Sequence, residues 1–260
     1  MSKEIPVYLF VGFLESGKTK FIQETFEDPQ FDSGDKTLLL ICEEGEEEYD
    51  PEKFAFGGVY PATLEDKSEL TKENLEMLAK KSGCGRVVVE YNGMWMLNDL
   101  AAAMPDNWVI YQCIATADGS TFKLYANDNA MRSLLLDKVA ASELIVLNRA
   151  ENVNDEESRE FVHKVVRQAS RRCDIAYEFA DGSVAYDDIP DPLPFDIDAP
   201  VIEIADQDFG VWYMDCSETP EKYKNKIVRF TAQVCQTPRA GKDAFVPGRF
   251  AMTCCVQDIQ

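Results

Sequence analysis

The chain has 260 residues, of which 45% are hydrophobic, and it carries 26 Lys and Arg against 47 Asp and Glu, a formal net charge of −21. This acidic excess argues against nucleic-acid binding by phosphate neutralisation and against docking on anionic lipid. No apolar run has the length needed to span a bilayer, and the N-terminus shows no leader segment, so we expect a cytoplasmic protein without membrane insertion.

Short apolar segments alternate with helical stretches along most of the chain. The apolar segments predict strands at residues 6–11, 37–42, 86–91, 108–114, 144–147 and 174–179. Helices are predicted at residues 18–26, 69–81, 120–141 and 156–171, the last of which carries the single histidine, His163, expected at the surface. Continuous apolar strands separated by helices indicate an α/β fold, a mostly parallel sheet with helices on both faces.

The pattern changes after residue 179. Residues 180–200 are rich in proline and aspartate, and because proline blocks both helix and strand pairing, this segment predicts a linker. Residues 201–260 hold short strand-like runs between turn signals, which predicts a small β-rich module, with an incomplete OB-like barrel as one interpretation. We therefore expect a nucleotide-binding domain at residues 1–179, a linker, and a C-terminal module.

Residues 12–19 read GFLESGKT, which fits the phosphate-loop pattern G-x-x-x-x-G-K-[ST]. A predicted strand precedes the motif and a predicted helix follows it, which is the context in which backbone N–H groups cradle phosphates. Lys18 would reach the β- and γ-phosphates in a catalytic role, and Thr19 would place its hydroxyl on Mg²⁺. A carboxylate cannot enter such a nest without repulsion, so Glu15 is expected to face outward. The predicted nucleotide-binding residues of the loop are Gly12, Glu15, Ser16, Gly17, Lys18 and Thr19.

A second acidic group is expected near the metal. Glu90 stands at the carboxyl end of a predicted strand, which is the ligand edge of an open α/β sheet. It could hold Mg²⁺ or orient the attacking water, and an exposed strand-end glutamate is the alternative. The acidic run at residues 43–50 (EEGEEEYD) falls where a switch loop is expected. One of its acids could lie near Mg²⁺, but the sequence does not say which, and a solvated loop is equally compatible.

Asn148, Arg149 and Glu151 belong to a segment that is similar to the base-reading N-K-x-D motif of GTPases. The carboxylate of Glu151 could accept hydrogen bonds from guanine N1–H and the 2-amino group, and Arg149 could stack over the base. Glu151 is one methylene longer than aspartate, which leaves an ATP-directed NTPase open as an alternative.

Together these motifs resemble the CobW-type GTPases, P-loop proteins associated with metal trafficking, over residues 5–179. GFLESGKT resembles that family's G-F-L-G-S-G-K-T, residues 88–93 its strand followed by E-T-S-G, and residues 42–46 its N-E-F-G-E. Residues 115–118 resemble its V-D-A segment and residues 141–148 its A-D-x-I-V-L-N-K. Residues 58–63 (GVYPAT) hold no cysteine where the family has C-x-C-C, so the resemblance predicts no internal metal site.

This resemblance implies an Mg²⁺-dependent protein that binds GTP, hydrolyses it slowly and acts as a switch in metal homeostasis, metallocentre assistance or transport. It leaves a metalloprotein client, a permease subunit and a second copy of the chain open as partners.

The C-terminal module resembles the soluble C-terminal region of permease-associated subunits, through residues 223–230 and 247–258. Its adjacent thiols, Cys254 and Cys255, could bind a soft metal such as Zn²⁺, and thiols within a small core are the alternative. A protein of another class therefore stays open: a non-hydrolysing metal- or partner-binding module with a relic phosphate loop.

Overall fold

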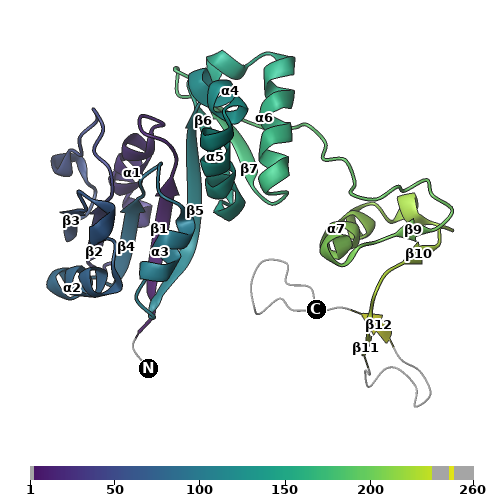
Figure 1. Cartoon of the computed structure of the whole chain (residues 1–260), viewed down its shortest axis with the longest axis horizontal. Coiled ribbons are helices and arrows are strands. Elements are labelled where there is room, and N and C mark those ends of the chain that lie inside the picture. Colours follow the sequence, from purple (N-terminus) through teal and green to yellow (C-terminus); the bar gives the residue numbers. More distant parts are fainter. Residues whose placement is uncertain (1–2, 236–245, 249–260) are drawn as a thin grey trace. The chain divides into compact units, whose positions relative to one another are not determined.

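An eight-stranded sheet forms the centre of the first of two compact units, Met1–Ile189, in the computed structural model, which describes residues 3–235 and 246–248 (Figure 1). The strand order is β3-β2-β4-β1-β5-β6-β7-β8, and all neighbours pair in parallel except β7 and β8. The predicted α/β fold is thereby confirmed. The strands are β1 (Ile5–Val11), β2 (Thr37–Ile41), β3 (Val59–Thr63), β4 (Arg86–Glu90), β5 (Trp108–Asp118), β6 (Leu144–Asn148), β7 (Asp174–Glu178) and β8 (Val184–Tyr186).

Helices cover both faces of this sheet because its strands are apolar on both sides. Val7 and Leu9 of β1 belong to a core shared with α2 to α6, whereas Phe10 points to the opposite face and joins a core with α1. Alternation of side chains along a strand accounts for this division. The helices are α1 (Lys18–Glu27), α2 (Lys72–Ser82), α3 (Leu97–Ala103), α4 (Gly119–Asn127), α5 (Asn129–Ala141) and α6 (Glu156–Ala169).

Several elements of the first unit differ from the sequence-based expectation. The single helix predicted at residues 120–141 is two helices, because the side chain of Asp128 accepts hydrogen bonds from the backbone N–H groups of Ala130 and Met131 and so begins a new helix. Strand β3 and helix α3 were not predicted. Pro61 interrupts the sequence pattern of β3, yet proline is tolerated there because β3 lies at the edge of the sheet.

The predicted linker at residues 180–200 belongs in part to the sheet. Strand β8 lies within it and pairs with β7, and the first unit extends to Ile189. The side chain of Asp187, directly after β8, contacts Nδ1 of His163 on α6 at 2.7 Å. His163 is 4% exposed, so its expected surface position was wrong: this carboxylate compensates for burial of the imidazole.

The second unit, Pro190–Gln260, has a small core of its own. Ile202, Ile204, Phe209 and Tyr223 are buried together in it. Its described residues include a parallel pair, β9 (Ile202–Glu203) and β10 (Val228–Arg229), and an antiparallel pair, β11 (Gln233–Cys235) and β12 (Val246–Gly248). They also include an α-helix, α7 (Phe209–Glu218). The strands agree with the predicted β-rich module, whereas the helix was not predicted.

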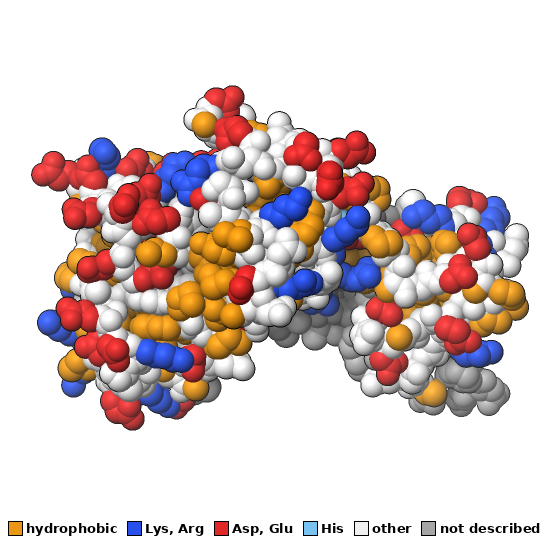
Figure 2. All heavy atoms as spheres, turned by 45° about the horizontal axis from the view of Figure 1, so that its top comes forward, with side chains coloured by type: hydrophobic (Ala, Val, Ile, Leu, Met, Phe, Trp, Pro, Cys, Tyr) orange, Lys and Arg blue, Asp and Glu red, His pale blue; other side chains and the backbone are white. Residues whose placement is uncertain are grey.

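The surface reflects the acidic composition: Asp and Glu side chains are spread over the face shown in Figure 2, with Lys and Arg among them. Within the part of the chain that the structure describes, no helix is long and apolar enough to cross a membrane.

Candidate nucleotide-binding site

One cavity lies at the carboxyl ends of the sheet strands, where the loops after β1, β2, β4, β6 and β7 meet. This is the edge at which open α/β sheets bind ligands, because the helix N-termini that follow the strands point there. Its lining residues are Leu14, Glu15, Gly17, Lys18, Thr19, Lys20, Glu43, Gly45, Glu47, Glu90, Asn148, Arg149, Glu178, Phe179, Ala180 and Gly182.

The phosphate loop owes its shape to two glycines in conformations that L-residues rarely adopt. Gly12 has φ +147° and Gly17 has φ +94°. A Cβ at Gly12 would lie 2.3 Å from the Thr116 carbonyl oxygen, and a Cβ at Gly17 would lie 2.3 Å from Nδ2 of Asn148. The loop is therefore closely packed between the ends of β5 and β6, and neither glycine position has room for a side chain.

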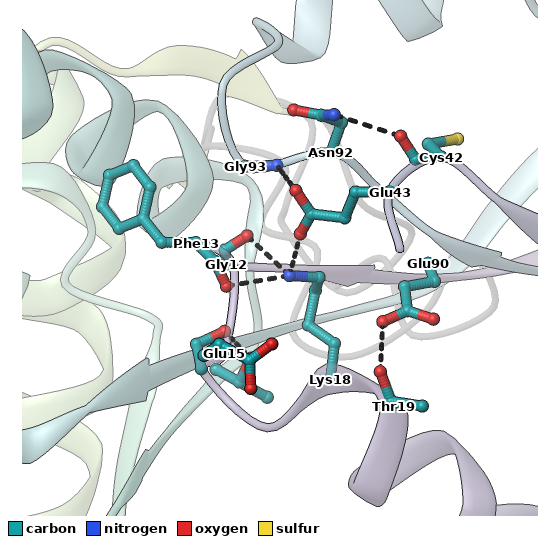
Figure 3. A network of polar contacts seen from close by, with 12 residues as sticks. Gly12, Phe13, Glu15, Lys18, Thr19, Cys42, Glu43, Glu90, Asn92 and Gly93 are labelled. Atoms are coloured by element: carbon teal, nitrogen blue, oxygen red, sulfur yellow. Dashed lines mark hydrogen bonds and ion pairs between the residues drawn. The ribbon is translucent and has the colours of Figure 1, made fainter. Parts of the chain in front are cut away.

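Lys18 lies at the centre of the site, 3% exposed, at the first position of α1. Its ammonium donates hydrogen bonds to the carbonyl oxygens of Gly12 at 3.0 Å and Phe13 at 2.9 Å, and it forms an ion pair with Glu43 Oε1 (Figure 3). A buried ammonium needs such compensation, because an isolated charge in the interior is costly.

Glu43 connects the phosphate loop with the loop that follows β4. Its second oxygen, Oε2, accepts a hydrogen bond from the backbone N–H of Gly93 at 3.1 Å. The adjacent Asn92 donates from its side chain to the carbonyl oxygen of Cys42 at 3.1 Å (Figure 3). The start of the acidic segment 43–50 is therefore held on one side by Lys18 and on the other by residues 92–93.

Thr19 and Glu90 meet as the motif predicts. The Thr19 hydroxyl donates to Glu90 Oε1 at 2.7 Å, and the Tyr49 hydroxyl donates to Glu90 Oε2 at 2.5 Å. Burial raises the pKa of Glu90 above its usual range, although hydrogen bonds from Tyr49 and Thr19 partly offset this. Burial, together with the neighbouring Glu90 charge, also raises the pKa of Tyr49, so the phenol stays a proton donor.

The base motif is joined to the phosphate loop by two side chains. Asn148 donates from Nδ2 to the carbonyl oxygen of Ser16 at 2.5 Å. Arg149 donates from Nη2 to the carbonyl oxygen of Glu15 at 2.7 Å and pairs with Asp118 Oδ2 at 2.6 Å. Burial alone would raise the pKa of Asp118, but hydrogen bonds from Arg149 and from residue 120 lower it. The guanidinium of Arg149, expected to stack on a base, is thus engaged with protein groups.

Glu15 faces away from the centre of the loop, as its charge requires. Its backbone is left-handed, with φ +59°, and its Oε1 accepts a hydrogen bond from the backbone N–H of Glu46 at 2.9 Å. Glu151 contacts the segment after β7, because its Oε1 accepts a hydrogen bond from the backbone N–H of Ala180. Each of the two carboxylates thereby fixes a loop at the cavity.

Most of the site residues expected from sequence come together here. Glu15, Gly17, Lys18, Thr19, Glu90, Asn148 and Arg149 line the cavity, Gly12 and Ser16 support it, and Glu151 reaches it through Ala180. The contact of Glu43 with Lys18 and that of Tyr49 with Glu90 were not predicted. The contact of Glu43 could have been predicted from its position just after β2, the strand that pairs with β4. No feature of the sequence indicates the contact between Tyr49 and Glu90.

The soft-metal ligands proposed from sequence, Cys254 and Cys255, lie outside the described residues. Among residues 3–235 and 246–248 there is no group of three or more His, Cys, Asp or Glu side chains that could hold a metal ion. An Mg²⁺ site of the kind predicted needs no such group, because Mg²⁺ is commonly held by one or two protein oxygens together with phosphate and water. The hydroxyl of Thr19 and the carboxylate of Glu90 have the hard oxygen atoms that such a site would need.

Comparison with known protein families decides the class of the site. Residues 6–176 match the family described as the CobW/HypB/UreG nucleotide-binding domain. The chain belongs to this family. Residues 190–260 match the DUF1980 C-terminal domain, so the family resemblances expected from sequence are confirmed. No curated protein matched the chain.

Three solved structures resemble part of the chain at low sequence identity. A zinc-bound triple mutant of the YjiA GTPase has a TM-score of 0.47 and 18% identity, covering 67% of this chain and 57% of its own. Zinc-bound YjiA from E. coli has a TM-score of 0.46 and 18% identity, with coverages of 66% and 57%. The hydrogenase maturation factor HypB from Archaeoglobus fulgidus has a TM-score of 0.46 and 16% identity, with coverages of 68% and 82%. The chain thus spans little more than half the length of the YjiA chains.

Proposed function

We propose that this chain is an Mg²⁺-dependent GTP-binding protein that hydrolyses GTP slowly and acts as a nucleotide switch in metal homeostasis. The observation that carries the proposal is the convergence of Lys18, Thr19 and Glu90 at the opening of α1, with Asn148 against the same loop. A cation, a hydroxyl and a carboxylate in this arrangement suit a nucleoside triphosphate with its metal ion.

Each side chain has a role in this chemistry. Lys18 and the backbone N–H groups of the loop would neutralise the charge that develops on the phosphates. Thr19 and Glu90 would hold Mg²⁺, which would neutralise negative charge on the phosphates. Glu90 would also orient the attacking water. Slow turnover is expected, because none of the described residues that line the cavity is an unengaged arginine that could stabilise the transition state.

Guanine is the proposed base. The support is the segment Asn148 to Glu151, which follows β6 and adjoins the cavity next to Ala180. One oxygen of Glu151 already accepts the Ala180 N–H, so the carboxylate must read guanine with its remaining oxygen or exchange partners. This sharing of Glu151 favours ATP as the second candidate, since ATP makes no demand on an acidic side chain at this position.

The output is proposed from family membership. The CobW/HypB/UreG assignment supports a role in metal homeostasis, metallocentre assistance or transport, with a metalloprotein client. The resemblance of residues 223–230 and 247–258 to permease-associated subunits adds a permease subunit as a candidate partner. Zn²⁺ on Cys254 and Cys255, and a homodimer, remain part of the proposal as predictions.

Binding of fluorescent GTP and ATP, each competed with the other unlabelled nucleotide, tests the proposal. We expect GTP to bind more tightly, Lys18→Ala to abolish binding, and Thr19→Ala to remove its Mg²⁺ dependence. Circular dichroism of Lys18→Ala establishes that the variant is folded. Absence of GTP binding by the wild-type protein would overturn the proposal, and tighter binding of ATP would replace guanine by adenine.

Metal analysis of the protein as purified distinguishes the proposed GTP-binding protein from the alternative, a metal-binding module with a relic phosphate loop. That alternative requires stoichiometric zinc that disappears in a Cys254→Ser, Cys255→Ser double variant, together with no nucleotide binding. Zinc together with GTP binding would extend the proposed function rather than contradict it.

A further inference from the structure

We infer that Glu43 occupies the place of the terminal phosphate of the nucleotide, and that the triphosphate must displace it in order to bind. This inference rests on the proposed function and adds the regulation of the same site. The family assignment does not supply it: it comes from where the two oxygens of one carboxylate lie.

The two oxygens of Glu43 contact two donors on opposite sides of the site. Oε1 pairs with the ammonium of Lys18, and Oε2 accepts the backbone N–H of Gly93 (Figure 3). Lys18 opens α1, directly after the loop that follows β1, whereas Gly93 follows β4. A Cβ at Gly93 would lie 2.7 Å from the Gly12 carbonyl oxygen, so the two loops are in close contact at this point.

An anion bridged by a lysine ammonium and a backbone N–H is the arrangement that a phosphate requires. Glu43 therefore has the charge and the contacts of a bound phosphate oxygen pair. The side chain of Lys18 is 3% exposed and that of Glu43 is 10% exposed, so water screens the pair only weakly. The carboxylate and a phosphate could not both remain on Lys18, because two anions in contact in such surroundings repel each other strongly.

Displacement of Glu43 would be transmitted to residues 43–50. This segment is held to the site at Glu43, at the Glu46 N–H, which donates to Glu15, and at Tyr49, which donates to Glu90. Release of the first contact frees the end of the segment nearest the phosphates and leaves the other two in place. The nucleotide state is thereby coupled to a surface segment rich in carboxylates.

The inference distinguishes triphosphate from diphosphate. Glu43 contacts Gly93 on the loop that follows β4, the strand that ends at Glu90. Glu43 would therefore compete with the terminal phosphate of a triphosphate, which would lie between Lys18 and this loop. A diphosphate lacks this group: its β-phosphate would replace Glu43 on Lys18, but the carboxylate would keep its contact with the Gly93 N–H. Removing the charge of Glu43 should therefore favour triphosphate more than diphosphate.

The test measures affinities of the full chain for a fluorescent non-hydrolysable GTP analogue and for fluorescent GDP. Glu43→Gln keeps an oxygen for the Gly93 N–H and removes the negative charge. We expect it to tighten the triphosphate analogue about tenfold and GDP less than about threefold, which corresponds to the loss of one competing ion pair. Glu44→Gln is the matched control, because Glu44 is exposed on the same segment and the change in net charge is the same.

Each result bears on the inference. Selective tightening of the triphosphate by Glu43→Gln but not by Glu44→Gln supports it. Equal tightening of both nucleotides, the same effect in both variants, or weaker binding by Glu43→Gln overturns it while leaving GTP binding intact. Binding by neither protein overturns the inference together with the proposed function.

Discussion

The hydroxyl of Tyr49 donates a 2.5 Å hydrogen bond to Glu90 Oε2, across 41 residues of sequence. Tyr49 thus connects the end of the acidic segment 43–50 with the carboxylate proposed to hold Mg²⁺. A hydrogen bond to the ionised form of a carboxyl stabilises that form and lowers its pKa. The contact therefore limits the rise in the pKa of Glu90 that burial causes.

Tyr49→Phe removes this donor without changing the packing of the ring. The pKa of Glu90 should rise further, so the acid limb of the proposed GTP hydrolysis, which would need the ionised carboxylate, should move to higher pH. The measurement is the turnover number as a function of pH. Tyr60→Phe, on exposed edge strand β3, is the control. An acid limb at the wild-type position in Tyr49→Phe would show that the contact does not tune Glu90.

Glu90 should also set a pH dependence of stability. Its folded-state pKa is raised above the reference value of 4.5, so its contribution to stability is fully present below the unfolded pKa and is lost as pH rises through the folded pKa. Where the pH exceeds this folded-state pKa, the buried carboxylate is ionised and burial penalises its charge. Glu90→Gln should then raise the free energy of unfolding by about 1 kcal/mol, and the gain should shrink towards about pH 4.

Urea unfolding at several pH values measures this, and GTP hydrolysis measured on the same variant should fall at least about a hundredfold. Glu44→Gln supplies the comparison for loss of one exposed charge. A Glu90→Gln variant that is less stable than wild type at about pH 8 would show that the ionised carboxylate stabilises the fold, contrary to this prediction.

The sheet and the phosphate loop could be predicted from the sequence because both depend on local sequence patterns. Apolar runs such as that of residues 86–90 need covering on both faces wherever they lie, and the loop between β1 and α1 has fixed spacing. Strands β3 and β8 escaped prediction because both lie at a sheet edge, and because Pro61 interrupts the pattern of β3 while β8 has only three residues. In β8 that neighbour is β7, and the side chain of Asp187 secures the pairing.

The site could be predicted only as far as its motifs reached. Lys18, Thr19 and Glu90 follow from spacing and from strand ends. The partners of those residues do not, because Glu43 and Tyr49 reach them from a segment whose course depends on tertiary contacts. Composition showed an acidic segment, but every acid in it has the same charge, and only the structure distinguishes one that binds the lysine from its exposed neighbours.

Glu15 should respond differently to glycine and to alanine. Its φ of +59° costs an L-residue about 1 kcal/mol or more relative to glycine, and its Oε1 accepts the Glu46 N–H. Both substitutions remove the acceptor, but only Glu15→Gly relieves the backbone. We expect Glu15→Ala to be less stable than Glu15→Gly by about 1 kcal/mol in urea unfolding. Hydrogen exchange at the Glu46 amide should accelerate in both variants; equal stability of the two would show that the left-handed conformation carries no cost.

Asp187 should hold the end of the sheet. Its side chain is 3% exposed, lies 2.7 Å from His163 Nδ1 and accepts a 3.2 Å hydrogen bond from the hydroxyl of Tyr177. Asp187→Ala removes the acceptor of two buried polar groups, so urea unfolding should show a loss of about 2–4 kcal/mol, with faster hydrogen exchange in β8. Asp188→Ala alters a less buried neighbour of equal charge and should stay within about 0.5 kcal/mol of wild type. Equal losses in the two variants would mean that the buried carboxylate does not secure β8 to α6.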